Sequence, residues 1–306
     1  MKILGFKRAF SMIELILVMV VLGIVASMGA TIIAQVYANY VLQKGMHHSS
    51  TKVEVAASII YNRLSNRIAS TTVGRDYSND TLITHVNNIT NPQLYDVLEW
   101  YGRATDSFNA NENGTNNPTW SGVCDIDSNA TTGLNIVTPG SNLSFLNTIV
   151  PNVSGSTVDD MALIFNDKTF SAGVSYDVSC MGYVNRNCIV RVDSITDDEN
   201  IALDQNYAGI RIHEQYQLTR SAYALVPIKR TDITNRDLYT LWLYYDYQPW
   251  EVENYKNHSS KKILLDNVSV FRFSGTGDTL RFKICVDEQI GDSEYVSICK
   301  EKAVIR

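Results

Sequence analysis

The sequence predicts an α+β protein in which a long N-terminal helix packs on an antiparallel, β-rich globular domain. Three observations carry this prediction. No charged residue occurs in the 28 residues from Leu15 to Leu42, and an apolar stripe at helical spacing follows them. Beyond about residue 118, segments rich in β-branched and aromatic residues alternate with polar turns. The composition, 45% hydrophobic and 19% charged, is that of an anchored globular protein rather than a disordered chain.

The first element expected is a single helix over residues 10–73. Its first half, about residues 15–42, is longer than the ~20 apolar residues that cross a bilayer, so we expect it to span a membrane. The second half has an apolar stripe with steps of four and three residues, which is one face of a helix. The stripe comprises Val53, Ala57, Ile60, Leu64 and Ile68. Gly74 is the predicted stop, and a break near Gly45 is left open.

Residues 74–306 are predicted to form one β-rich globular domain. The region from 74 to 118 is polar and rich in asparagine, and a short helix is expected at 92–102. Strands are expected at 174–195 (two strands around a turn), 209–228, 237–247, 262–286 (strand, turn, strand) and 295–305. The length suffices for one large domain or two small ones, and one domain is the simpler interpretation.

The distribution of charge argues against one class of partner. The net charge is +5 over residues 1–73, −12 over 74–205 and +1 over 206–306, which together give the −6 of the whole chain. Nucleic-acid phosphates require surfaces rich in lysine and arginine. An acidic middle region therefore disfavours nucleic-acid binding, and we interpret it as a solvated face.

The segment KRAFSMIELILVMVVLGIVA, residues 7–26, holds a carboxylate, Glu14, just inside the apolar run. A secretory signal peptide has an apolar core of only ~7–15 residues and no acid at its head. A plain signal anchor, with Lys2, Lys7 and Arg8 on the cytoplasmic side, leaves Glu14 only an interaction with its own helix N-terminus. An ionisable group in lipid costs roughly 3 kcal/mol, so it points to a function.

The same stretch closely resembles the signal of the type IV prepilin family, which comprises type IV pilins and type II secretion pseudopilins. The resemblance implies that a prepilin peptidase removes the leader 1–9 by cleaving between Ala9 and Phe10, and that the new amine is methylated. It also implies that Glu14 neutralises this amine on a neighbouring subunit, since two buried charges are tolerable as a pair. Two positions depart from the pattern: Ala9 replaces the commoner glycine, and Thr31 stands where many major pilins have proline.

The length of the chain favours a large minor subunit at the tip or the start of a fibre. The C-terminal segments LYYDYQPWEVENY, ILLDNVSVFRF and LRFKICV resemble those of J-like minor pseudopilins and W-like minor pilins. The family implies a bacterial inner-membrane protein with one span and a periplasmic globular domain over residues 74–306. The partners it implies are other pilins or pseudopilins, the prepilin peptidase and the inner-membrane assembly platform. A type II secretion pseudopilus and a type IV pilus both fit.

All five cysteines follow the predicted helix and are expected in the periplasm, where disulfides form. Cys180 and Cys188 flank a predicted hairpin turn, and Cys285 and Cys299 lie on two predicted strands joined by a loop. The sequence predicts one disulfide within each pair and leaves Cys124 unpaired. The alternative is that all the thiols are free and buried.

Motifs for catalysis are missing from the sequence, so no catalytic residue, no enzyme activity and no cofactor are expected. The segment HEQYQ at 213–217 lacks the second histidine of a zinc helix. Two acidic clusters are candidates for calcium, although a solvated loop is the simpler interpretation. The first comprises Asp125 and Asp127, and the second Asp197, Asp198 and Glu199.

The alternative function is a membrane-anchored periplasmic enzyme or carbohydrate-binding protein. A sugar site would need exposed aromatic side chains. The candidates are Trp242, Tyr244, Tyr245, Tyr247 and Trp250. Aromatic residues on strands more often belong to the core.

Overall fold

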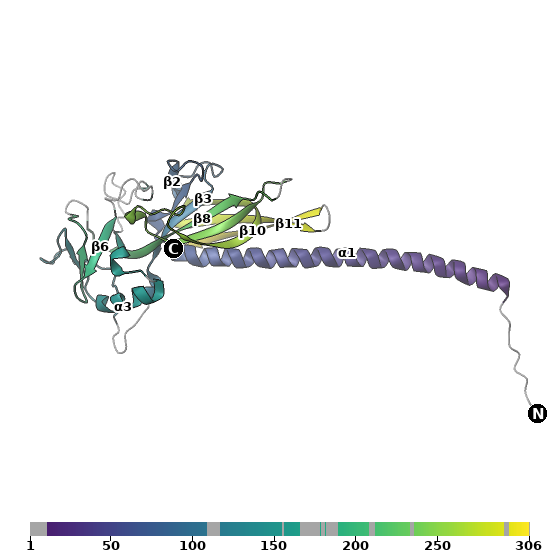
Figure 1. Ribbon diagram of the computed structural model, residues 1–306, viewed down its shortest axis with the longest axis horizontal. Coiled ribbons are helices and arrows are strands. Elements are labelled where there is room, and N and C mark those ends of the chain that lie inside the picture. The colour runs from purple at the N-terminus through teal and green to yellow at the C-terminus, as the bar shows by residue number, and fades with distance from the viewer. Residues whose placement is uncertain are drawn as a thin grey trace, which may run out of the picture. The chain divides into compact units, whose positions relative to one another are not determined.

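The computed structural model describes residues 11–108, 117–154, 156–165, 178, 181, 189–207, 212–232, 236–290 and 294–305. A long helix, α1 (Met12–Ser65), is followed by a large antiparallel sheet and two shorter helices, α2 (Thr105–Phe108) and α3 (Leu143–Ser154) (Figure 1). The chain divides into two compact units, Met1–Thr51 with Glu288–Val296, and Lys52–Asp287 with Ser297–Arg306. The predicted α+β class, a long N-terminal helix and an antiparallel sheet, is confirmed.

The sheet holds twelve strands in the described part of the chain. They are β1 (Val73–Arg75), β2 (Ile83–His85), β3 (Val97–Arg103), β4 (Asn135–Val137), β5 (Ala162–Phe165), β6 (Val190–Ile195), β7 (Asn200–Leu203), β8 (Tyr216–Lys229), β9 (Tyr239–Tyr247), β10 (Ser260–Thr276), β11 (Thr279–Ile290) and β12 (Glu294–Ile305). The order is β12-β11-β10-β9-β8-β5-β6-β7-β4, and β3 pairs with β8 and β1, which in turn pairs with β2. The predicted strands at 209–228, 237–247, 262–286 and 295–305 correspond to β8 through β12.

Helix α1 is continuous through Gly45, so the helix has no break there. The hydroxyl groups of Ser27 and Thr31, within its apolar half, are satisfied by the helix itself. Ser27 Oγ donates to the carbonyl of Ile24 at 3.0 Å, and Thr31 Oγ1 donates to that of Met28 at 2.8 Å. These polar residues therefore add no unpaired hydrogen-bonding group to the apolar surface of the helix.

The helix ends at Ser65, and the prediction that it extends to residue 73 is wrong. The chain turns through a 3₁₀ segment, Ala69–Thr71, and then enters β1, whose pairing with β2 and β3 takes Val73–Arg75 out of the helix. Gly74 is not a helix stop. A Cβ there would approach Ile89 Cδ1 to 2.8 Å, so glycine allows a close approach of side chains to the strand.

The short helix predicted at 92–102 is also wrong, because this segment contains strand β3. Apolar residues at positions 94, 97, 98 and 101 imitate a helical period. In the structure β3 lies between β1 and β8 and is buried on both faces. A strand that is buried on both faces has a nearly continuous apolar sequence instead of an alternating one. Of the predicted strands at 174–195, the structure describes β6, and most of the rest lies outside the described residues.

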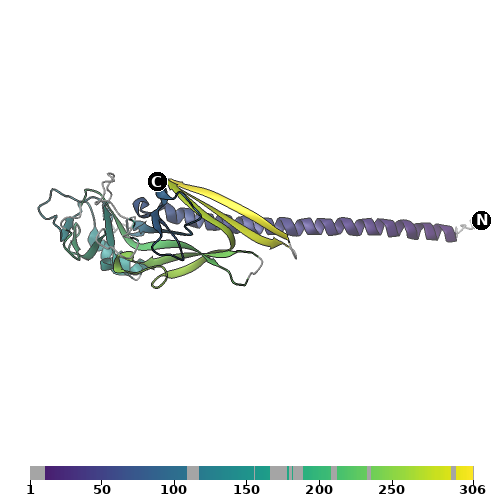
Figure 2. The same ribbon diagram turned by 90° about the horizontal axis from the view of Figure 1, so that it is seen from above.

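The predicted apolar stripe of α1 packs on the sheet and forms its main core cluster. Val53, Ala57, Ile60 and Leu64 are all at most 1% exposed. They share the cluster with residues of β3, β8 and β9, among them Leu98, Trp100, Leu225 and Leu241. Figure 2 shows the yellow C-terminal strands beside the end of α1. Ile68, the last member of the stripe, follows the helix and belongs to a second cluster around Tyr101 and Trp250.

A buried ion pair lies within the sheet, between β1 and β3. Arg75 Nη2 is 3.1 Å from Glu99 Oε2, and both side chains are completely buried. Tyr247 donates its hydroxyl to Glu99 Oε1 at 2.8 Å, while the guanidinium also donates to the carbonyls of Asp80 and Met181 at 2.8 and 2.6 Å. Buried charges are tolerated only when they are paired and hydrogen-bonded, and this pair meets both conditions.

Candidate functional site

The first half of α1 exposes a continuous apolar surface. Leu22 is 67% exposed and Ile33 is 70% exposed, and the other large apolar side chains between Met12 and Val36 are also exposed. In the part of the chain that the structure describes, α1 is the helix that is long and apolar enough to cross a membrane. A surface of this size needs lipid or apolar partners to cover it.

Glu14 lies at the N-terminal end of this apolar surface, in the first turn of α1. Its backbone N–H donates to the hydroxyl oxygen of Ser11 at 3.3 Å, and its side chain is exposed. The next charged residue along the chain is Lys44. A single carboxylate is therefore presented to the surroundings of the helix next to the predicted processing site. Ala9 and Phe10, which form that site, lie outside the described residues.

The last strand is attached to α1 by Glu54. Its two carboxylate oxygens are 2.6 Å from Lys300 Nζ and 2.8 Å from Lys302 Nζ. Lys302 also donates to Ser58 Oγ at 2.9 Å. Hydrogen bonds from both lysines lower the pKa of Glu54 to about 2. The spacing of these residues in the sequence does not predict this contact, although two lysines at alternate positions of a strand do point to one face.

The Glu54 contact predicts a pH dependence of stability. A carboxylate with a lowered pKa in the folded protein stabilises it fully above the unfolded value, near 4.5, and loses this effect as the pH falls through about 2. We expect wild type to unfold at a higher temperature than Glu54→Gln at neutral pH, and the difference to disappear towards pH 2. The measurement is thermal unfolding of both proteins across this range.

A matched control for this experiment is Glu301→Gln, which changes an exposed carboxylate between the two lysines on β12. The difference in unfolding temperature between this variant and wild type is expected to vary much less with pH. If the difference in unfolding temperature between Glu54→Gln and wild type stayed constant down to pH 2, the two lysines would not hold the carboxylate in its charged form.

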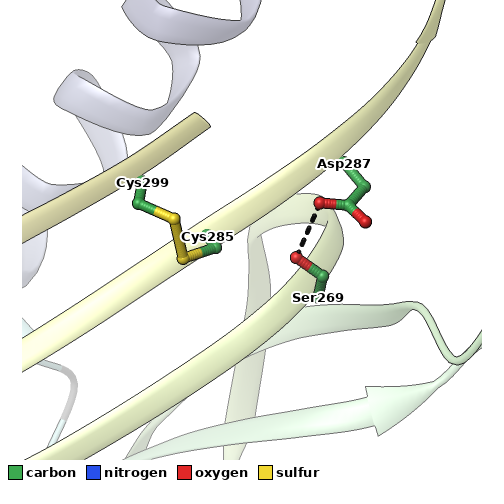
Figure 3. Close-up of a disulfide and its surroundings, with 4 residues drawn as sticks. All are labelled: Ser269, Cys285, Asp287 and Cys299. Carbon is green, nitrogen blue, oxygen red and sulfur yellow. Dashed lines mark hydrogen bonds between the residues drawn. A yellow bond between two sulfur atoms is a disulfide. The ribbon is translucent and has the colours of Figure 1, made fainter. Parts of the chain in front are cut away.

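The predicted disulfide between Cys285 and Cys299 is present and joins β11 to β12 (Figure 3). The two cysteines are 14 residues apart, and closing a loop of this length stabilises a fold by roughly 3 kcal/mol. Beside the disulfide, Ser269 Oγ donates to Asp287 Oδ1 at 2.9 Å and ties β10 to β11. The C-terminal strands are thus crosslinked to each other and attached to the helix.

The remaining cysteines are described in part. Cys124 is a buried free thiol, and burial raises its pKa to about 11, so it is neutral at physiological pH. The predicted pair Cys180 and Cys188 lies outside the described residues and stays a prediction.

The acidic residues proposed for calcium are Asp125 and Asp127, and Asp197, Asp198 and Glu199. Four of them accept hydrogen bonds through their carboxylates, from their own loop or from a neighbouring segment, whereas Asp127 donates its backbone N–H. Asp125 Oδ1 accepts the backbone N–H groups of Asp127 and Ser128 at 3.1 and 3.2 Å, and Glu199 Oε1 accepts that of Gly140 at 2.8 Å. Within the described ranges, no three His, Cys, Asp or Glu residues come together to hold a metal ion.

The five aromatic residues considered for a sugar site do not form one exposed platform. Tyr247 and Trp250 are completely buried and Tyr244 is 7% exposed, whereas Trp242 and Tyr245 are half-buried. Trp250 packs edge-on against Tyr101, with ring centroids 5.2 Å apart, and donates its indole N–H to the carbonyl of Asp160. Most of this aromatic set therefore belongs to the core of the sheet.

No protein-family model, curated protein or solved structure matches this chain. Its class is consequently defined by architecture alone. It is an α+β protein in which a single N-terminal helix is long and apolar enough in its first half to cross a membrane, and packs in its second half on an antiparallel sheet. This arrangement is consistent with a pilin-like architecture.

Proposed function

We propose that the protein is a minor pilin or pseudopilin, a structural subunit of a type II secretion pseudopilus or a type IV pilus. One observation carries the proposal: Glu14 is the only charged residue between Leu42 and the sequence Lys7-Arg8-Ala9-Phe10, and it lies four residues after Phe10, at the start of a long apolar helix surface. In a helix that served only as an anchor, the weak interaction of the carboxylate with its own helix N-terminus would not offset its cost in lipid.

In the proposed mechanism the protein acts by assembly and not by turnover. A prepilin peptidase cleaves between Ala9 and Phe10 and leaves a positive amine in an apolar environment. Glu14 of one subunit pairs with the amine of a neighbour, since each charge offsets the burial cost of the other. The exposed apolar surface of α1 exchanges lipid for the helices of neighbouring subunits, which the family resemblance implies for the fibre.

The proposed location is the bacterial inner membrane, with the globular domain in the periplasm. Lys2, Lys7 and Arg8 favour a cytoplasmic N-terminus. The disulfide between Cys285 and Cys299 suits an oxidising compartment. A chain of 306 residues is large for the repeating subunit of a fibre, so we place it at the tip or at the start of assembly.

The test of this function is co-purification from membranes. The tagged full-length protein is produced in a strain that carries the other prepilins and the assembly platform of one such system. We expect those prepilins to be recovered with it, and not with an unrelated single-span protein bearing the same tag. Recovery of the protein alone, with no other prepilin above the level of the unrelated bait, would contradict the proposal.

A further inference from the structure

A small polar cavity of about 50 Å³ lies between the end of α1 and the strands β3 and β8. Its lining includes three arginines, which come from different elements of the fold. They are Arg63 from α1, Arg103 from β3 and Arg220 from β8. Three like charges around one small cavity repel one another, so this arrangement costs stability unless something of opposite charge lies between them.

Arg63 is held in place by an aromatic ring instead of by a carboxylate. Its guanidinium lies 5.6 Å from the centroid of the Tyr223 ring, which stacks on Trp100 at 5.8 Å. Gly102 makes this possible, because a Cβ there would come within 2.4 Å of the Tyr223 ring. A guanidinium that stacks through its face keeps the N–H groups of its edge available for an acceptor.

Arg103 is held in the same way. Its guanidinium is 5.8 Å from the centroid of the Phe108 ring. Its Nε is buried and has no hydrogen-bond partner among the residues that the structure describes. A buried donor without an acceptor costs free energy, so this N–H group is expected to meet an acceptor from outside the described part of the chain.

Only one carboxylate among the described residues lies at the cavity. Asp106, itself exposed, has Oδ2 at 3.5 Å from Arg220 Nη2. Three guanidinium groups and one carboxylate leave a net charge of +2. A phosphate group carries about −1.5 to −2 at neutral pH and balances this charge, whereas a single additional carboxylate would leave half of it uncompensated.

The size of the cavity leads to the same kind of ligand. A water molecule needs roughly 10–15 Å³ of such space, so about 50 Å³ accommodates a group of four or five heavy atoms. We infer that this cavity binds a doubly charged tetrahedral oxyanion, of which a phosphate group is the model, through the edges of Arg63, Arg103 and Arg220. The inference does not rest on the proposed function.

The test uses the full-length protein in detergent micelles and inorganic phosphate as the probe. Isothermal titration should show one saturable site. Charge-assisted hydrogen bonds to arginine are strong enough that Arg103→Gln should weaken phosphate binding roughly ten- to hundredfold. Arg63→Gln should weaken it as well, and because Arg63 is exposed this variant keeps the experiment decisive if Arg103→Gln fails to fold.

The matched control is Arg281→Gln, which removes an exposed arginine on β11 and should leave phosphate binding unchanged. Titration with glycerol 3-phosphate distinguishes two sources of the anion: tighter binding than inorganic phosphate indicates a phosphate ester, and weaker binding a free ion. Three results would overturn the inference. They are no saturable phosphate binding up to about 10 mM, equal binding by wild type and both arginine variants, or acetate binding as tight as that of phosphate.

Discussion

Glu99→Ala is expected to lower the free energy of unfolding by about 3–5 kcal/mol, because it leaves Arg75 as a buried charge without its carboxylate. The hydroxyl of Tyr247 loses its acceptor in the same variant. Both consequences act inside the sheet, where the two side chains of the ion pair are completely buried. The measurement is urea unfolding of the full-length protein in micelles, followed by the fluorescence of the buried Trp100 and Trp250.

Asp237→Asn is the matched control for this prediction. It removes the carboxylate of an exposed ion pair, in which Asp237 Oδ1 is 2.6 Å from Lys229 Nζ and both side chains are more than half exposed. Exposed pairs contribute about 0–1 kcal/mol, so little change is expected. If Glu99→Ala destabilised the protein no more than Asp237→Asn, the pair with Arg75 would not be buried as the structure has it.

Glu14→Gln is expected to abolish most of the recovery of other prepilins from membranes. If Glu14 neutralises the amine of Phe10 on a neighbour, the substitution leaves an unpaired charge in an apolar surrounding, which costs ~3–5 kcal/mol. If it only interacts with its own helix N-terminus, the cost is ~0.5–1 kcal/mol. The larger figure corresponds to a loss of more than a hundredfold in association, which a quantitative pull-down detects.

Because this effect belongs to the assembly step, the globular domain of Glu14→Gln should fold normally and cleavage between Ala9 and Phe10 should proceed. Glu301→Gln, which removes an exposed carboxylate of the globular domain, serves as the control and should leave partner recovery intact. If Glu14→Gln recovered the other prepilins as well as wild type does, the carboxylate would contribute no more than the dipole interaction within its own helix.

Local periodicity accounts for the parts of the fold that were predicted. The stripe of Val53, Ala57, Ile60 and Leu64 has a helical period, and these residues pack on the sheet as expected. The strands β8 to β12 are long and rich in β-branched and aromatic residues, so each segment has a strong preference of its own. Strand β3 was mistaken for a helix because its apolar residues satisfy both periods over a short length.

Contacts between distant parts of the chain could not be predicted in this way. Arg75 and Glu99 are 24 residues apart, and Glu54 meets Lys300 and Lys302 near the opposite end of the sequence. Because the strand order cannot be derived from the sequence pattern, the spacing of two residues along the chain does not give the distance between them in the fold. The cavity lined by Arg63, Arg103 and Arg220 could not be predicted for the same reason, because three different elements supply one arginine each.

The central claim, that residues 7–26 are a prepilin signal, is tested most directly by mass spectrometry of the N-terminus. The protein is purified from membranes of a host with a prepilin peptidase and from the same host without it. With the peptidase, we predict a chain that begins at Phe10 and carries a methylated amine; without it, a chain that retains the leader. An intact Met1 in the presence of the peptidase, or a start near Tyr37 as a secretory peptidase would give, would contradict the account.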